Sequence, residues 1–428
     1  MTFNAEPSMM DLARQLYPIQ RSLAGPGNRE SLRILSEHIP ELRLTEVATG
    51  TKIGEWTVPS EWAVRAARLT DPSGRVIADV ADNNLHLVGY STSVDKHLSL
   101  DELRPHLHSF PELPEAVPYV TSYYRKTWGF CLSDKAVANL KPGQYHVLID
   151  TEFVEGSMTI AEAVYKGNSE KEVLISTYIC HPQMMNNEIS GPVVATQTAK
   201  WVSQLQNRHF TYRFVIAPET IGSITYISQN LEQLKQNLVA GYVLTCIGDE
   251  RGYSYVESIS GITLADRIAR RSLHHIDPDF NNRSFLERGS DERQYNSPGV
   301  ALPVGTLSRS GVGNYPEYHT SHDDHRVVTA DGLEGGYRAV RSCIERLEQS
   351  NIYSSDSVGE PFLSAYGLYP TISRRGGLDI DTKNLVDVFA YSDGSRTMED
   401  IADDLSISIE SVDAATKLLE NARLISRL

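Results

Sequence analysis

The segment Ser176-Thr-Tyr-Ile-Cys-His-Pro-Gln-Met-Met-Asn-Asn-Glu-Ile-Ser-Gly191 places a histidine and a carboxylate close together after an apolar run. That run, over residues 171–179, is typical of a buried strand, so His181 follows the end of a strand where open α/β sheets bind ligands. The last residues begin a helical pattern, with Asn187 and Glu188 at its entrance. This arrangement indicates a divalent metal site. The alternative is an imidazole bonded to a loop carbonyl and a carboxylate that serves the helix N-terminus.

Three further segments end in residue types that a metal-assisted hydrolase needs. The apolar run 212–218 ends at Glu219, the first candidate for the general base. The run 238–248 ends at Asp249, a candidate metal ligand. A Gly-rich loop is followed by several histidines, of which His319 is the predicted ligand, because the others flank acids typical of an exposed loop. Since these strand ends meet at one edge of the predicted sheet, we expect the residues to form one site.

The order of these residues resembles the zinc aminopeptidases of the bacterial leucyl-aminopeptidase type. More closely, the chain resembles bacterial proteins with an aminopeptidase-like domain, through the phrases Cys180-His-Pro, Pro218-Glu-Thr-Ile-Gly-Ser, Gly289-Ser-Asp-Glu-Arg-Gln-Tyr295 and Pro316-Glu-Tyr-His-Thr-Ser321. The resemblance implies an α/β fold with a zinc-exopeptidase-like mixed sheet flanked by helices. It also implies a zinc site with the ligands His181, Glu188, Asp249 and His319.

Two positions depart from the pattern of that superfamily, in which a bridging aspartate and a Glu-Glu pair help to hold two zinc ions. Asn187 stands where the bridging aspartate is expected, so we expect the adjacent Glu188 to bind the metal with Asn187 behind it. Thr220 replaces the second glutamate, which leaves Glu219 to act as base or as ligand. These two replacements leave open whether the site holds one zinc ion or two, and whether the activity is full or reduced.

Other residues are candidates for substrate contact. Tyr318 is expected to donate a hydrogen bond to the developing oxyanion, unless it packs under its loop. Asp291, Glu292 and Arg293 concentrate charge in one loop, and Arg293 is suited to bind a substrate carboxylate through a bidentate fork. An internal ion pair explains the same three residues equally well.

Composition favours a cytoplasmic enzyme. The chain has 428 residues, of which 40% are hydrophobic and 22% charged, and a net charge of −15 that disfavours nucleic acid and anionic membranes as partners. No apolar run reaches the roughly 20 residues that span a bilayer, and the first residues lack the pattern of a secretory signal. Four widely spaced cysteines are typical of reduced thiols.

We predict four regions along the chain. Residues 1–55 begin the catalytic domain, 56–155 form an inserted β-rich domain, 156–355 complete the catalytic domain, and 356–428 form a winged helix. The last helix carries Glu410, Asp413 and Glu420 against Lys417. This acidic face predicts a contact with protein, such as a second copy of the chain in a homo-oligomer, rather than with DNA.

The predicted function is that of a zinc-dependent hydrolase. It would cleave an amide or N-terminal peptide bond of a small peptide or aminoacyl amide by metal-activated water. One alternative is a metal-binding pseudoenzyme or scaffold, because two superfamily ligands are replaced. Another is a metal-responsive regulator that uses the winged helix.

Overall fold

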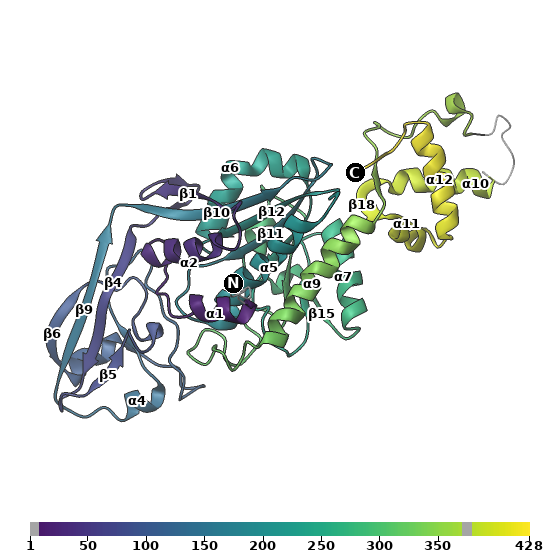
Figure 1. Ribbon diagram of the computed structural model, residues 1–428. Helices are drawn as coiled ribbons and strands as arrows, with labels where there is room; N and C mark the ends of the chain where they lie inside the picture. Colours follow the sequence, from purple (N-terminus) through teal and green to yellow (C-terminus); the bar gives the residue numbers. More distant parts are fainter. Residues whose placement is uncertain (1–7, 370–378) are drawn as a thin grey trace, which may run out of the picture.

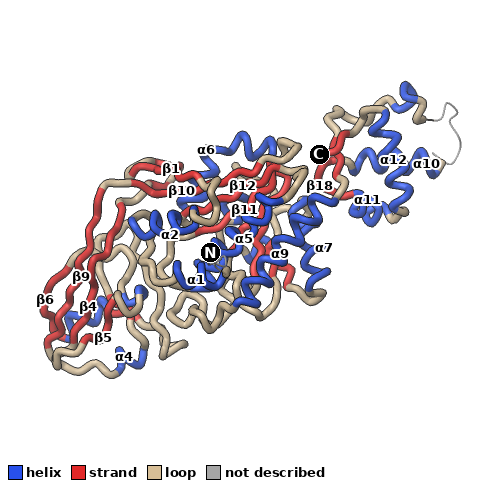
Figure 2. Tube along the Cα trace, in the orientation of Figure 1, coloured by secondary structure: helices blue, strands red, loops and turns tan. Residues whose placement is uncertain are grey.

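The computed structural model describes residues 8–369 and 379–428 (Figures 1 and 2). Its centre is a mixed sheet of eight strands flanked by helices, which confirms the predicted fold class. In spatial order the strands are β1 (Arg43–Ala48), β10 (Ser157–Tyr165), β12 (Thr211–Ala217), β11 (Glu172–Tyr178), β13 (Leu238–Leu244), β16 (Val304–Ser308), β14 (Ser254–Val256) and β15 (Asn281–Arg283).

The four middle strands, β12, β11, β13 and β16, are parallel to one another. Three of them are the predicted apolar runs, and every residue of β11 and β12 is buried. Because neighbouring parallel strands end at the same edge, the segments that carry His181, Glu219 and Asp249 all leave the sheet there.

Helices cover both faces of this sheet. Side chains alternate along each strand, so that Val173 and Ile175 pack into one core while Leu174 packs into the other. The first core contains residues of α1 (Met9–Leu16), α2 (Pro26–Ser36), α5 (Ser190–Gln204), α7 (Leu264–Ile276) and α9 (Ala330–Gln349). The second contains residues of α6 (Ile221–Asn237) and α8 (Glu292–Tyr295).

The first turn of α5 lies unusually close to the sheet. A Cβ atom on Gly191 would come within 2.3 Å of Thr177 Oγ1 and 2.4 Å of the Leu244 carbonyl oxygen. A side chain therefore does not fit here, and glycine at position 191 permits this contact. The close approach fixes the helix entrance, with Asn187 and Glu188, against the ends of β11 and β13.

A second, four-stranded antiparallel sheet lies at one end of the molecule (Figure 1). It consists of β4 (Glu61–Thr70), β5 (Val76–Asp79), β6 (Val94–Ser99) and β9 (Gln144–Val154), with β2 (Lys52–Ile53), β3 (Trp56–Thr57), β7 (Leu107–His108), β8 (Phe130–Cys131), α3 (Leu100–Leu103) and α4 (Asp134–Ala138) around it. Glu61 fixes this sheet to α2 by accepting two hydrogen bonds from Arg29, at 2.7 and 2.6 Å.

A loop of the β-rich region also contacts the loop that carries His319. The Tyr119 N–H donates to the carbonyl oxygen of His319 at 2.8 Å, and the Ser321 N–H donates to that of Val117 at 2.8 Å. The aromatic segment that begins at Tyr119 is therefore held against the edge of the main sheet where the strand ends meet.

The C-terminal residues form a separate unit with its own core, at the opposite end of the molecule (Figure 1). It consists of a small sheet, β17 (Ile352–Ser354), β18 (Asp393–Thr397) and β19 (Ser426–Arg427), with α10 (Ile380–Tyr391), α11 (Met398–Leu405) and α12 (Ile409–Asn421). Thr397 and Asp400 cap α11 reciprocally. Arg271 of α7 donates to Asp400 at 2.8 Å and so joins the unit to the main domain.

None of the helices in the two described ranges combines the length and apolar character needed to cross a membrane. The prediction that no secretory signal is present depends on residues 1–7, which lie outside the described residues.

Candidate active site

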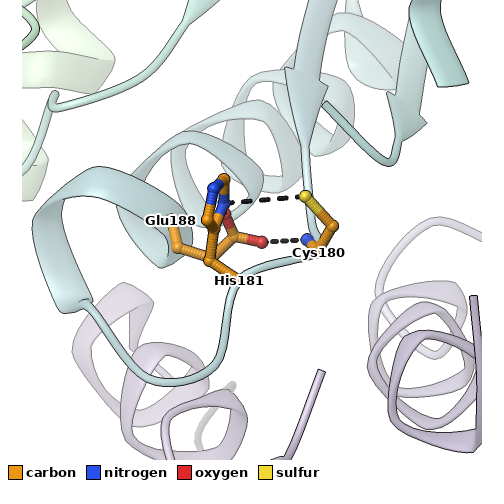
Figure 3. Close-up of side chains that lie close together, drawn as sticks. All are labelled: Cys180, His181 and Glu188. Carbon is orange, nitrogen blue, oxygen red and sulfur yellow. Dashed lines mark hydrogen bonds and ion pairs between the residues drawn. The ribbon is translucent and has the colours of Figure 1, made fainter. Parts of the chain in front are cut away.

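His181 and Glu188 lie together at the end of β11 (Figure 3). Glu188 is fully buried in the π-helical turn η3 (Met185–Ile189). One of its carboxylate oxygens lies 2.6 Å from His181 Nδ1, and the other accepts from the backbone N–H of Cys180. The partner of the imidazole is thus a carboxylate rather than a loop carbonyl. This contact leaves His181 Nε2 free on the opposite side of the ring.

A buried arginine supports the loop that carries His181. Arg21 is 1% exposed, and its guanidinium donates to the carbonyl oxygens of His181 at 2.9 Å, Gln183 at 3.3 Å and Leu16 at 2.6 Å. Gln183 has φ of +50°, a conformation that needs such support. No sequence pattern indicated this role for Arg21, which is far from the loop along the chain.

Cys180 completes a buried group of potential metal ligands. Among the described residues, Cys180, His181 and Glu188 offer ligand atoms within 4.8 Å of one another. Burial raises the pKa of the Cys180 thiol to about 11, which keeps the sulfur protonated at neutral pH. Burial opposes protonation of His181, yet Cys180 and Glu188 raise the pKa of its imidazole overall. Any metal that binds His181 therefore has to displace a proton.

Glu219 faces the free side of His181 from the end of β12. Its Oε2 lies 3.6 Å from His181 Nε2, and its side chain is 20% exposed. Burial raises the pKa of the Glu219 carboxyl, which makes the carboxylate a better proton acceptor near neutral pH. The Glu219 carboxylate and the free nitrogen of His181 thus face one another at the carboxyl edge of the sheet.

The backbone after Glu219 adopts an unusual conformation. Thr220 has φ of +65°, and its N–H donates to Asp291 Oδ1 at 2.8 Å. Burial and the charge of Glu219 raise the pKa of the Asp291 carboxyl to about 8. Asp291 therefore holds the turn that presents Glu219, which is an internal contact and not the predicted contact with substrate.

The other two charged residues of this segment, Glu292 and Arg293, have different surroundings. The Glu292 carboxylate is buried and accepts from the N–H groups of Gly289 and Ser290 and from the Thr306 hydroxyl, so it supports the loop and is not available to a substrate. Arg293 is 42% exposed and lies 3.7 Å from Glu219 Oε1. Of the three predicted substrate contacts, Arg293 is the one that faces both the site and the solvent.

Asn187 occupies the position at which the resemblance implies a bridging aspartate. Its backbone N–H donates to Asp323 at 3.0 Å, and its side-chain amide donates to the Tyr178 hydroxyl at 3.0 Å. The buried Asn187 Oδ1 has no hydrogen-bond partner within the described chain. An oxygen left unpartnered in this way is available to a cation. His181 contacts Tyr178 as well, with ring centroids 5.6 Å apart.

Asp249 does not join the group formed by His181 and Glu188. Its two oxygens accept hydrogen bonds from the Asn186 amide at 2.8 Å, the Ser310 hydroxyl at 2.7 Å, and the N–H groups of Arg251 and Ser310. Because both oxygens are occupied, this geometry does not favour the predicted ligand role of Asp249. The strand-end pattern placed the residue at the correct edge but did not determine where its side chain points.

His319 and Tyr318 cover the site together with Tyr119. The His319 ring lies 5.7 Å from that of His181 and is stacked on Tyr318 at 3.9 Å, between centroids. Tyr119 contacts both imidazoles edge-on, at 5.1 and 5.3 Å. Burial and the charge of His181 lower the pKa of His319 to about 3, so this imidazole stays neutral. The β-rich region thus supplies a wall of the site.

Comparison with known proteins identifies the family. The family model described as "Domain of unknown function (DUF4910)" matches residues 10–350, and one described as "winged helix-turn-helix" matches residues 351–427. The chain therefore belongs to the DUF4910 family, and the predicted C-terminal winged helix is confirmed.

Individual relatives agree with this placement. A Clostridium acetobutylicum protein named "Putative polysaccharide biosynthesis protein with aminopeptidase-like domain" is 38% identical over 97% of this chain and 95% of its own length. The crystal structure of a "putative peptidase" from the same species is 36% identical, with a TM-score of 0.80 over 98% of this chain and 96% of that one. These matches confirm the resemblance to an aminopeptidase-like domain.

A more distant structure shares the fold. The zinc aminopeptidase of Bacillus subtilis is 12% identical, with a TM-score of 0.55 over 80% of this chain and 96% of that one. The chain thus has a peptidase-like fold.

Proposed function

We propose that this chain is a zinc-dependent hydrolase that cleaves an amide or N-terminal peptide bond in a small substrate. The observation that carries the proposal is the geometry of His181, whose Nδ1 bonds to Glu188 while its Nε2 faces Glu219 at 3.6 Å. A carboxylate on one nitrogen orients a histidine for metal binding through the other. Small peptides and aminoacyl amides are the substrates that the resemblance implies.

The residues present fit one zinc ion better than two. His181 Nε2 and the unpartnered Asn187 Oδ1 are nitrogen and oxygen donors, and the neutral His319 is a third candidate. Glu188 and Asp249 have both carboxylate oxygens occupied by hydrogen bonds. Thr220 replaces the second glutamate of the superfamily. We therefore propose that Glu188 orients His181 and does not bind the metal itself.

Zinc, when bound, would polarise the scissile carbonyl and lower the pKa of water. Glu219 then accepts the proton of the attacking water and passes it to the leaving nitrogen. Burial raises the pKa of Tyr318, so its hydroxyl keeps its proton and can donate to the developing oxyanion. Asp291 keeps Glu219 in place through the Thr220 N–H.

We expect zinc removal to abolish hydrolysis and zinc return to restore it. The test is metal content per chain, measured alongside turnover of a panel of aminoacyl amides, N-acetyl amino acids and N-acetylglucosamine. The sugar is included because the Clostridium relative is named for polysaccharide biosynthesis. A chain that binds zinc at one ion per chain but turns over none of the panel would favour the metal-binding scaffold.

The winged helix is proposed to bind protein, most simply a second copy of the chain, and not DNA. On α12, Glu410 and Glu420 are exposed, while Lys417 is paired with Asp413 at 2.5 Å. Large apolar side chains are also exposed in this unit, including Phe362 at 75% and Ile380 at 67%. We propose that these exposed side chains contribute to a contact with protein.

Light scattering of the full-length chain and anisotropy with a labelled DNA duplex test this proposal. We expect an oligomer and no salt-sensitive duplex binding. A monomer that binds duplex at physiological ionic strength would reverse the assignment and favour the regulator.

A cytoplasmic location is proposed as well, since all four cysteines are free and buried.

A further inference from the structure

Apart from Glu219, the carboxylates around the candidate site are engaged inside the protein. An aminopeptidase needs a negative group to bind the free amino group of its substrate. Each of the following has an internal hydrogen-bond or ion-pair partner: Glu188, Asp249, Asp291, Glu292, Glu317 and Asp323. Five of these six side chains are buried, whereas Glu317 is partly exposed; one Glu317 oxygen lacks a hydrogen-bond partner in the described chain but is itself buried. They do not form a counter-charge for a substrate ammonium group.

The most exposed charge at the site is positive, because Arg293 is 42% exposed and the Glu219 carboxylate beside it is 20% exposed. Of the charged side chains that contact Glu219 or Thr220 in the described part of the chain, His181 and Asp291 are buried, and Arg293 is 42% exposed. Its guanidinium makes only loose contacts, at 3.7 Å to Glu219 Oε1 and 3.4 Å to Thr220 Oγ1. Most of its five N–H donors therefore remain free for a planar anion.

These charges discriminate between two classes of amide. A substrate with a free amino group beside the scissile bond would bring a cation next to Arg293, where the Glu219 carboxylate already faces that guanidinium at 3.7 Å and is assigned to proton transfer. A substrate with an acylated nitrogen has no such cation, and a carboxylate on it can pair with the guanidinium. Tyr119 and Tyr318 are partly exposed, so apolar substrate atoms can contact their rings.

We infer that the substrate is an N-acylated compound with a free carboxylate, which Arg293 binds, rather than a compound with a free amino terminus. The inference rests on the proposed hydrolase function and narrows its substrate class. N-acetylated amino acids and N-acetylated acidic sugars share this chemistry.

The test compares three leucine compounds on the full-length zinc-loaded chain: N-acetyl-L-leucine, its methyl ester and L-leucinamide. We expect kcat/KM for N-acetyl-L-leucine to exceed that for the ester by roughly 10- to 100-fold, because only the acid can pair with Arg293. Arg293→Met should remove this preference through KM, and Arg293→Lys should keep part of it. Arg288→Met is the matched control, because Arg288 is exposed five residues before Arg293 and stacks on Phe285.

A binding measurement separates this inference from the proposed function. Calorimetric titration of the full chain, after chelation of metal, with N-acetyl-L-leucine should show binding that Arg293→Met weakens and Arg288→Met does not. If no compound is hydrolysed but this binding difference is found, the carboxylate site stands and the hydrolase proposal fails. Faster turnover of L-leucinamide than of N-acetyl-L-leucine, or a preference that Arg293→Met leaves intact, would overturn the inference while the hydrolase proposal stands.

Discussion

Replacement of Glu219 by glutamine is expected to lower kcat by roughly 100- to 10,000-fold, the range typical for loss of a general base. Glutamine keeps the size of the side chain but cannot accept a proton from water. The zinc content should stay at the wild-type value, because we assign the metal to His181 and its neighbours. Steady-state kinetics on the best substrate of the panel, with elemental analysis of the same sample, measures both quantities.

Glu257→Gln is the matched control for this variant. Glu257 has the same 20% exposure as Glu219 and also faces an arginine, Arg270, at 2.6 Å. Its substitution should leave kcat unchanged. If Glu219→Gln keeps near-wild-type turnover, the proton acceptor is another residue. If it loses zinc, Glu219 is a ligand, which its 3.6 Å distance from His181 Nε2 also permits.

The strands that carry the site could be predicted from sequence because each is a continuous buried run. Residues 171–179 and 212–218 correspond to β11 and β12, whereas the run 238–248 extends four residues beyond β13, which ends at Leu244. Parallel pairing brings the ends of the three strands to one edge. The same reasoning placed Asn187 and Glu188 correctly at the entrance of α5. These features depend on local pattern and on a general rule for α/β sheets.

The direction of each side chain could not be predicted in this way. Asp249 leaves the sheet at the expected edge, but Asn186 and Ser310 bind its carboxylate. Those contacts depend on loops from three separate segments, whose meeting is determined by tertiary packing. The prediction of Asp249 as a ligand therefore used the position of the residue without the hydrogen bonds that compete for it.

Two supporting residues were beyond sequence reasoning for a similar reason. Arg21 reaches the His181 loop from the N-terminal region, and Tyr119 reaches it from the β-rich region. A lone arginine or tyrosine in a loop has many possible partners, and no periodicity indicates which one it meets. The contact of Tyr119 with His319 depends on the two backbone hydrogen bonds between their loops.

Replacement of His181 by alanine is expected to remove zinc binding, together with all zinc-dependent activity. His181 Nε2 is the donor atom that faces the site. Loss of a residue that only supports a ligand lowers metal affinity by roughly 10- to 100-fold, and loss of the ligand His181 should lower the zinc affinity by more than that. Glu188→Gln is the informative companion, because glutamine can keep one acceptor oxygen but not both. Its zinc affinity should fall by that smaller factor, since the imidazole would lose its orientation but not its donor.

Asp249→Asn completes this series. It tests whether Asp249 binds the metal, as the superfamily pattern implies, or only accepts hydrogen bonds within the protein, as the structure indicates. Asparagine keeps one acceptor oxygen for Asn186 or Ser310, so the variant should be less stable in a denaturant titration but should bind zinc with near-wild-type affinity. Competition with a chromogenic chelator measures the affinity of all three variants. If Asp249→Asn loses zinc to the same degree as His181→Ala, Asp249 binds the metal after a rearrangement of its loop. If His181→Ala keeps full zinc affinity, the metal binds at another site.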